Sequence, residues 1–154
     1  YTPATQMLHG LAEGIDMLHE EGLDNVFARH DRFAEATRRA VKAWGLEIMC
    51  KDAKYYSPTI TAVMMPEGHN GDAFRAQALD TFNISYGASF GAYTGKYFRI
   101  GHLRDINDGY LVGALGITEM ALAHAGIPHK KGGVQAAIDY LASSLGGGAK
   151  VAAE

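Results

Sequence analysis

The stretch KYFRIGHLRD, residues 96–105, combines a β-strand pattern with a permanent positive charge. Tyr97, Phe98 and Ile100 favour β structure because such side chains pack well on a pleated surface. Side chains alternate along a strand, so Arg99 is expected on the opposite face from Phe98 and Ile100. A guanidinium offers a planar fork that matches a carboxylate with two parallel hydrogen bonds. The residues alone leave two interpretations open: an anchor for an anion, and an edge-strand arginine paired with a surface carboxylate.

The neighbours of Arg99 suit a site for a small anion. Gly101 shares the predicted face with Arg99 and leaves room beside the guanidinium, whereas His102 on the other face is expected to be a packed residue. Three glycines spaced four residues apart precede the strand: Gly87, Gly91 and Gly95. This spacing differs from the dinucleotide fingerprint and from the P-loop. We therefore interpret these glycines as positions of tight turning and close backbone approach.

The rest of the chain carries helix and strand patterns in an order that favours an α+β fold. Apolar residues at helical spacing predict helices between Thr5 and Gly22, between Asp24 and Gly45, and over 70–82, 108–125 and 131–145. Segments rich in β-formers predict short strands at 46–50, 60–65, 83–86 and in the opening stretch. We expect the first two helices to form an αα-hairpin. Because strands and helices do not alternate regularly, we expect a small antiparallel sheet with helices packed on one face.

Composition and charge narrow the classes of function. The chain has 154 residues, which suits one domain, and a formal net charge of -3, which argues against a nucleic-acid surface. No run of about 18 apolar residues predicts a membrane span. The single cysteine, Cys50, rules out an internal disulfide and predicts a reducing, cytoplasmic compartment. The chain opens at Tyr1, and its first residues are typical of the middle of a longer sequence. We therefore expect a fragment of a longer protein.

Metal binding and nucleophilic catalysis find little support in the sequence. The chain has seven histidines, but none forms the paired helical motif of a zinc protease. The stretch DINDGY, 105–110, resembles a calcium loop, yet Gly116 stands where the loop needs a glutamate. There is no Gly-x-Ser-x-Gly motif, and Cys50 lies in a predicted buried strand, where it is expected to act as a small hydrophobe. We therefore predict no metal site and no catalytic nucleophile in this chain.

Three longer stretches resemble one enzyme family. They are TGKYFRIGHLRDINDGYLVGAL (94–115), YTPATQMLHGLAEGIDMLHEEGLDNVFARH (1–30) and SPTITAVMMPEG (57–68). Together they resemble the C-terminal part of the class V, fold-type I pyridoxal-phosphate aminotransferases, in the serine–glyoxylate and alanine–glyoxylate branch. The resemblance extends to about Ala125. It implies the α+β small domain of that fold, and amino-group transfer between serine or alanine and a 2-oxo acid such as glyoxylate or pyruvate.

The resemblance also implies roles for individual residues. Arg99 stands where the family's arginine grips the α-carboxylate of the substrate. Thr2 stands where the family places a threonine that reaches the cofactor phosphate of the neighbouring subunit. Arg104 stands where the family usually has glycine. The lysine that forms a Schiff base with pyridoxal phosphate is expected upstream of this chain, so the chain alone is expected to be inactive.

The resemblance further implies how the chain is organised and what it binds. Residues 1–22 are expected to form a linking helix from a missing large domain, residues 23–146 the small domain, and residues 147–154 a flexible tail. The expected partners are amino-acid and 2-oxo-acid substrates and a second copy in a homodimer, without nucleic acid or membrane. A competing interpretation is a non-catalytic α+β binding or assembly module, because a fold alone does not imply a function.

Overall fold

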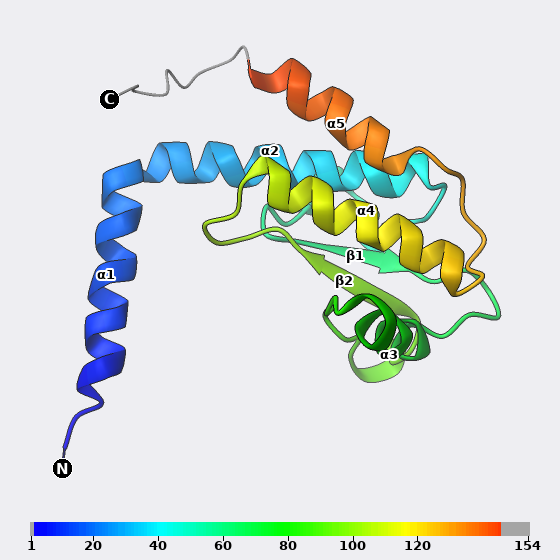
Figure 1. Cartoon of the computed structure of the whole chain (residues 1–154), viewed down its shortest axis with the longest axis horizontal. Helices are drawn as coiled ribbons and strands as arrows, with labels where there is room; N and C mark the ends of the chain where they lie inside the picture. The colour runs from blue at the N-terminus through cyan, green and yellow to red at the C-terminus, as the bar shows by residue number, and fades with distance from the viewer. Residues whose placement is uncertain (1, 146–154) are drawn as a thin grey trace.

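The computed structural model describes residues 2–145, so the predicted tail at 147–154 lies outside the described residues. Five α-helices, two strands and two short 3-10 helices follow one another in the described part (Figure 1). They are α1 (Thr5–Glu21), α2 (Leu23–Ala43), η1 (Ala53–Tyr55), β1 (Ile60–Met64), α3 (Gly71–Phe82), η2 (Gly91–Tyr93), β2 (Tyr97–Gly101), α4 (Asp108–His124) and α5 (Gly133–Ser144). This arrangement confirms the predicted α+β fold with a small antiparallel sheet.

The sheet pairs β1 with β2 in antiparallel order, with Val63 opposite Phe98 and Ala62 opposite Arg99. The segment 46–50 runs beside β1 but forms only the single bridge of Ile48 to Val63. The predicted strand at 83–86 is wrong, because that segment is irregular and only Gly87 forms a bridge, to Arg99. Both segments follow sharp turns at helix ends. Each contains or adjoins a single isolated bridge, which is shorter than the run of paired residues that makes a strand.

Helices α2, α4 and α5 pack against one another, while α2 also contacts β1 and α3 contacts both β2 and α4. The side chains at their centre are fully buried: Phe33, Val41, Trp44, Val63, Phe98, Leu111, Leu115 and Leu122. Three aromatic rings join α3 to the sheet, since Phe74 stacks on Tyr86 and tilts against Phe98. The face of β2 that carries Phe98 therefore packs against the core.

Two helices begin on asparagine caps. The Asn70 side chain accepts hydrogen bonds from the backbone N–H groups of Asp72 and Ala73 at the start of α3. The Asn107 side chain accepts one from Tyr110 N–H at the start of α4. Each cap satisfies backbone donors that a helix leaves unpaired in its first turn.

The predicted αα-hairpin of the first two helices is wrong. The chain turns at Gly22, whose φ of 83° lies in the left-handed region. As a result α1, which precedes this turn, extends away from the rest of the molecule (Figure 1). No residue of α1 is buried, and Phe27 near the start of α2 is also exposed. A helical pattern predicts a helix and its apolar face, but not what that face packs against.

Candidate functional site

Arg99 is the centre of the candidate site, and its backbone is held on both edges of β2. On one edge it lies opposite Ala62 of β1. On the other edge Arg99 and Gly87 exchange two backbone hydrogen bonds of 3.0 Å each. A Cβ at Gly87 would lie 2.9 Å from Arg99 Nε, so glycine is needed for this approach. The expected close backbone approach at Gly87 is thus confirmed.

The Arg99 side chain lies over the loop that precedes β2. Arg99 Nε donates a 2.8 Å hydrogen bond to the carbonyl oxygen of Ala88. The Phe90 ring lies against the guanidinium, with 4.4 Å between Arg99 Cζ and the ring centroid. Arg99 is half-buried, whereas its strand neighbours Phe98 and Ile100 are buried, which confirms the predicted alternation.

Arg99 makes no ion pair with any carboxylate of residues 2–145. Across the same residues Nε forms its only side-chain hydrogen bond, which leaves the four N–H bonds of Nη1 and Nη2 available. The edge-strand interpretation required a surface carboxylate partner. A half-buried guanidinium with a free fork is chemically able to bind a carboxylate through two hydrogen bonds.

His102 follows the strand and belongs to the core, as predicted. Its side chain has 0% exposure. The Pro58 carbonyl can only accept, so His102 Nδ1 donates to it at 3.1 Å, and Thr61 Oγ1 donates to Nε2 at 2.9 Å. Burial lowers the pKa of His102 from 6.5 to about 4, so the ring is neutral at pH 7.

The structure does not bring the other predicted site residues to Arg99. Thr2 is exposed and precedes α1, the helix that extends away from the sheet (Figure 1). Gly101 is not needed for space, because a Cβ there would make only an ordinary contact, 3.5 Å from Leu103. The lysines of the described residues are all exposed: Lys42, Lys51, Lys54, Lys96, Lys130 and Lys131.

Arg104 lies in the loop between β2 and α4 with φ of 79°, a conformation that favours glycine. Its carbonyl oxygen accepts a 2.6 Å hydrogen bond from Arg29 Nη1. Arg29 also makes a two-point ion pair with Glu21 at the end of α1, with distances of 2.6 and 2.7 Å. One guanidinium therefore joins α1, α2 and this loop.

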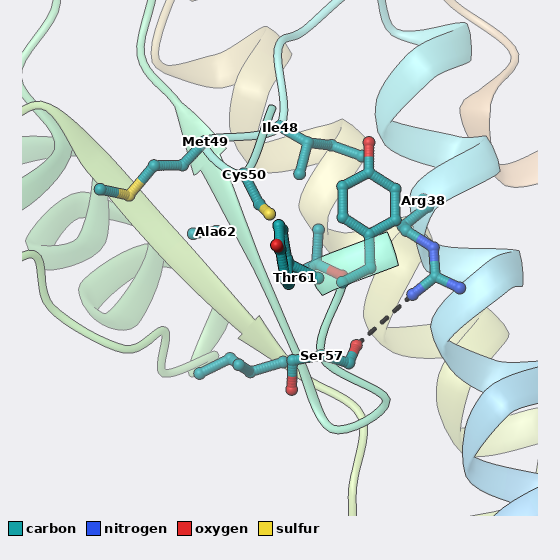
Figure 2. Close-up of a pocket in the computed structure, with 10 residues that line it drawn as sticks. Arg38, Ile48, Met49, Cys50, Ser57, Thr61 and Ala62 are labelled. Atoms are coloured by element: carbon teal, nitrogen blue, oxygen red, sulfur yellow. Dashed lines mark hydrogen bonds between the residues drawn. The ribbon is translucent and has the colours of Figure 1, made fainter. Parts of the chain in front are cut away.

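A second feature, a pocket of about 300 Å³, lies between α2, β1 and the 48–57 segment (Figure 2). The sequence analysis missed it because its lining comes from several separate segments: Arg38, Ile48, Met49, Cys50, Tyr55, Tyr56, Ser57, Ile60, Thr61 and Ala62. Arg38 is already engaged there by Glu35 at 3.3 Å and by the Ser57 carbonyl at 3.4 Å. The lining is mainly apolar and does not include Arg99.

Cys50 corrects one expectation. It lies outside any strand and is half-buried at the pocket, where Cys50 Sγ donates to the Asp52 carbonyl at 3.4 Å. The segment leaves the sheet edge after Ile48, so the apolar run LEIMC does not continue as a strand. Within residues 2–145, no three histidine, cysteine or acidic side chains cluster as metal ligands would. None of the described helices combines the length and apolarity that a membrane span requires.

The fold agrees with the similarity of this chain to known aminotransferases. The serine–glyoxylate aminotransferase of Hyphomicrobium methylovorum is 46% identical over 145 residues, which cover 94% of this chain and 36% of that protein. The Arabidopsis thaliana serine–glyoxylate aminotransferase is 44% identical over 142 residues, covering 92% of this chain and 35% of that protein. No protein-family model matches the chain.

A solved structure gives the same picture. The ureidoglycine–glyoxylate aminotransferase of Bacillus subtilis superposes with a TM-score of 0.85 at 33% identity, covering 92% of this chain and 37% of that one. The chain belongs to the class V pyridoxal-phosphate aminotransferase family. Within it, the chain is homologous to the C-terminal part of the serine–glyoxylate aminotransferases, and spans little more than a third of their length.

Proposed function

We propose that this chain supplies the substrate-carboxylate site of a pyridoxal-phosphate-dependent aminotransferase. The observation that supports it is the half-buried Arg99, whose Nη1 and Nη2 have no partner among residues 2–145. A carboxylate would accept two parallel hydrogen bonds from this fork. Arg99 would hold one end of the substrate and so orient the carbon at which the amino group is exchanged.

The proposed reaction transfers an amino group between serine or alanine and a 2-oxo acid. Glyoxylate is the preferred acceptor, because the names of the similar aminotransferases reported above include it. Amino acids and 2-oxo acids both carry a carboxylate beside the reacting carbon. One arginine can therefore serve both halves of the exchange.

The cofactor would be pyridoxal phosphate, whose role is to act as an electron sink. The lysines of residues 2–145 are all exposed, and we place the cofactor lysine in a large domain upstream of this chain. We also propose that the full-length protein is a cytoplasmic homodimer. In that dimer Thr2, carried by the protruding α1, would reach the cofactor phosphate of the neighbouring subunit.

The test uses a full-length protein that contains this chain. Replacing Arg99 with Ala should lower kcat/KM for both the amino acid and glyoxylate by roughly a hundredfold, because the substrate loses its orientation. Arg99→Lys should retain only part of the kcat/KM of the unmodified protein, since a single ammonium cannot form the bidentate pair. Arg39→Ala removes another arginine, exposed on α2, and should keep full activity.

Unchanged kinetics in Arg99→Ala would overturn the anchor role. The competing function, a non-catalytic binding module, is not favoured by the similarity to aminotransferases. It would be supported if the purified full-length protein bound no pyridoxal phosphate and transferred no amino group from serine or alanine.

A further inference from the structure

The loop before β2 carries an aromatic residue that has no role in the function proposed so far. Phe90 leaves 62% of its surface exposed, although a large apolar side chain gains stability from burial. Its ring nevertheless has a defined place, 4.4 Å from Arg99 Cζ. This distance is within the range of a cation–π contact, in which the ring face attracts the positive charge.

The backbone of Phe90 is tied to the same strand that carries Arg99. Phe90 N–H donates a 3.2 Å hydrogen bond to the hydroxyl oxygen of Tyr97, two residues before Arg99. Just before Phe90, the Ser89 hydroxyl accepts a 2.7 Å hydrogen bond from Gly95 N–H, which closes the loop on itself. These contacts fix the backbone that carries the Phe90 ring, independently of the contact between the ring and the guanidinium.

Two contacts therefore restrain the Arg99 guanidinium from two directions. The Ala88 carbonyl oxygen binds Nε at one edge, and the Phe90 ring covers one face. Rotation about the last bonds of the side chain would break the first contact or collide with the second. The edge that bears Nη1 and Nη2 is then the one presented to a ligand.

We propose that Phe90 is a positioning residue for carboxylate recognition by Arg99. The inference rests on the proposed function and deepens it: Phe90 holds the guanidinium plane so that the carboxylate of an amino acid or 2-oxo acid binds end-on, through Nη1 and Nη2. A pre-oriented fork loses less side-chain entropy when the ligand binds. Phe90 touches neither the reacting carbon nor the cofactor in this role, so its effect falls on substrate binding.

The experiment compares Phe90→Ala, Phe90→Tyr and Tyr93→Ala in the full-length protein loaded with pyridoxal phosphate. Phe90→Ala should raise KM for glyoxylate roughly threefold to thirtyfold, with little change in kcat, because it removes a cation–π contact. Competitive inhibition by propionate, which offers only a carboxylate, should weaken by the same factor. Phe90→Tyr keeps the aromatic face and should restore both values.

Tyr93→Ala is the matched control from the same loop. Tyr93 is also exposed, and the centroid of its ring lies 5.6 Å from the ammonium of Lys96. Its removal should leave KM and propionate inhibition unchanged. If Tyr93→Ala raised KM and weakened propionate inhibition as much as Phe90→Ala does, the loop as a whole, and not the ring of Phe90, would set the affinity. That result would overturn the proposal.

Arg99→Ala, measured in parallel, separates the two proposals. If it abolishes propionate inhibition while Phe90→Ala behaves as the unmodified protein, Arg99 is the anchor and the role of Phe90 is wrong. If Arg99→Ala leaves propionate inhibition intact, the proposed carboxylate site itself is wrong. Because Phe90 is exposed, its variants should keep the thermal midpoint, and Phe90→Leu provides a second non-aromatic test if the alanine variant does not fold.

Discussion

Arg104 adopts a backbone conformation with φ of 79°, which costs an L-residue about 1–2 kcal/mol relative to a right-handed one. Arg104→Gly should therefore raise the free energy of unfolding by about 1 kcal/mol, after the greater freedom of glycine in the unfolded chain is subtracted. Urea unfolding measures this difference. The resemblance to the aminotransferase family predicted glycine at this position, and the positive φ supplies the physical reason.

Arg104→Ala is the control for that prediction. It removes the same exposed side chain but keeps a Cβ in the left-handed conformation, so its stability should match that of the unmodified chain. If alanine and glycine stabilise equally, the side chain of Arg104, and not its backbone, is the source of the strain.

His102 should make stability depend on pH. Burial lowers its folded-state pKa to about 4, against 6.5 when unfolded, so the unfolded chain binds a proton first as the pH falls. The stabilisation is complete above about pH 6.5 and is lost progressively down to about pH 4, by about 3 kcal/mol. Urea unfolding of the unmodified chain and of His102→Gln across this interval should show a flatter profile for the variant.

His9→Gln is the matched control, because His9 is exposed on α1. The free energy of unfolding of His9→Gln should depend on pH as that of the unmodified chain does. A profile for His102→Gln as steep as that of the unmodified chain would show that other groups cause the acid loss of stability.

Among the elements, α4 and α5 are joined by one carboxylate. Glu119 of α4 accepts hydrogen bonds from Trp44 Nε1 at 2.7 Å and from the backbone N–H groups of Gly132 and Val134 at 3.0 and 3.1 Å. The last two lie at the start of α5, where unpaired N–H groups favour a negative charge. Burial opposes the charge on Glu119, but these hydrogen bonds keep its pKa below the ordinary value.

Glu119→Ala should lower the free energy of unfolding by about 1–3 kcal/mol, because three donors lose their partner. Since the folded-state pKa of Glu119 is lowered, its contribution is present above the ordinary carboxyl pKa of 4.5 and is lost as the pH falls through the folded value. The difference in the free energy of unfolding between the unmodified chain and Glu119→Ala should therefore narrow below about pH 4.5. Glu13→Ala, an exposed carboxylate on α1, should show no gap at neutral pH.

At the scale of the whole molecule, α1 contributes little to the packed body. None of its residues is buried, and apolar side chains such as Met7 and Leu11 remain exposed. Removing residues 1–21 should change the free energy of unfolding of the remainder by no more than about 1 kcal/mol, the usual contribution of a surface ion pair such as Glu21 with Arg29.

Thermal unfolding and circular dichroism test that prediction. The shortened chain should keep a cooperative transition at nearly the same temperature. It should also self-associate less than the full chain in sedimentation experiments, since it lacks the exposed apolar side chains of α1. Loss of the cooperative transition would show that α1 packs on the body in solution.

The sequence alone accounts for much of this protein, because several signals act over only a few residues. Helical spacing placed the helices correctly to within a few residues, and alternation in KYFRIGHLRD placed Arg99 opposite the buried face of β2. The same stretch carried the resemblance to aminotransferases, which sequence similarity confirms.

Other features depend on residues that are distant in sequence and meet only in the folded chain. Segments 46–50 and 83–86 had strand composition, but pairing along a ladder decides whether a strand forms. The contacts of Arg99 with Ala88 and Phe90, and the absence of a carboxylate partner within residues 2–145, follow from how the 87–91 loop returns to β2. The direction of α1 likewise depends on the turn at Gly22 and on the Arg29 ion pair. Local patterns specify which elements form, whereas long-range packing sets where they meet.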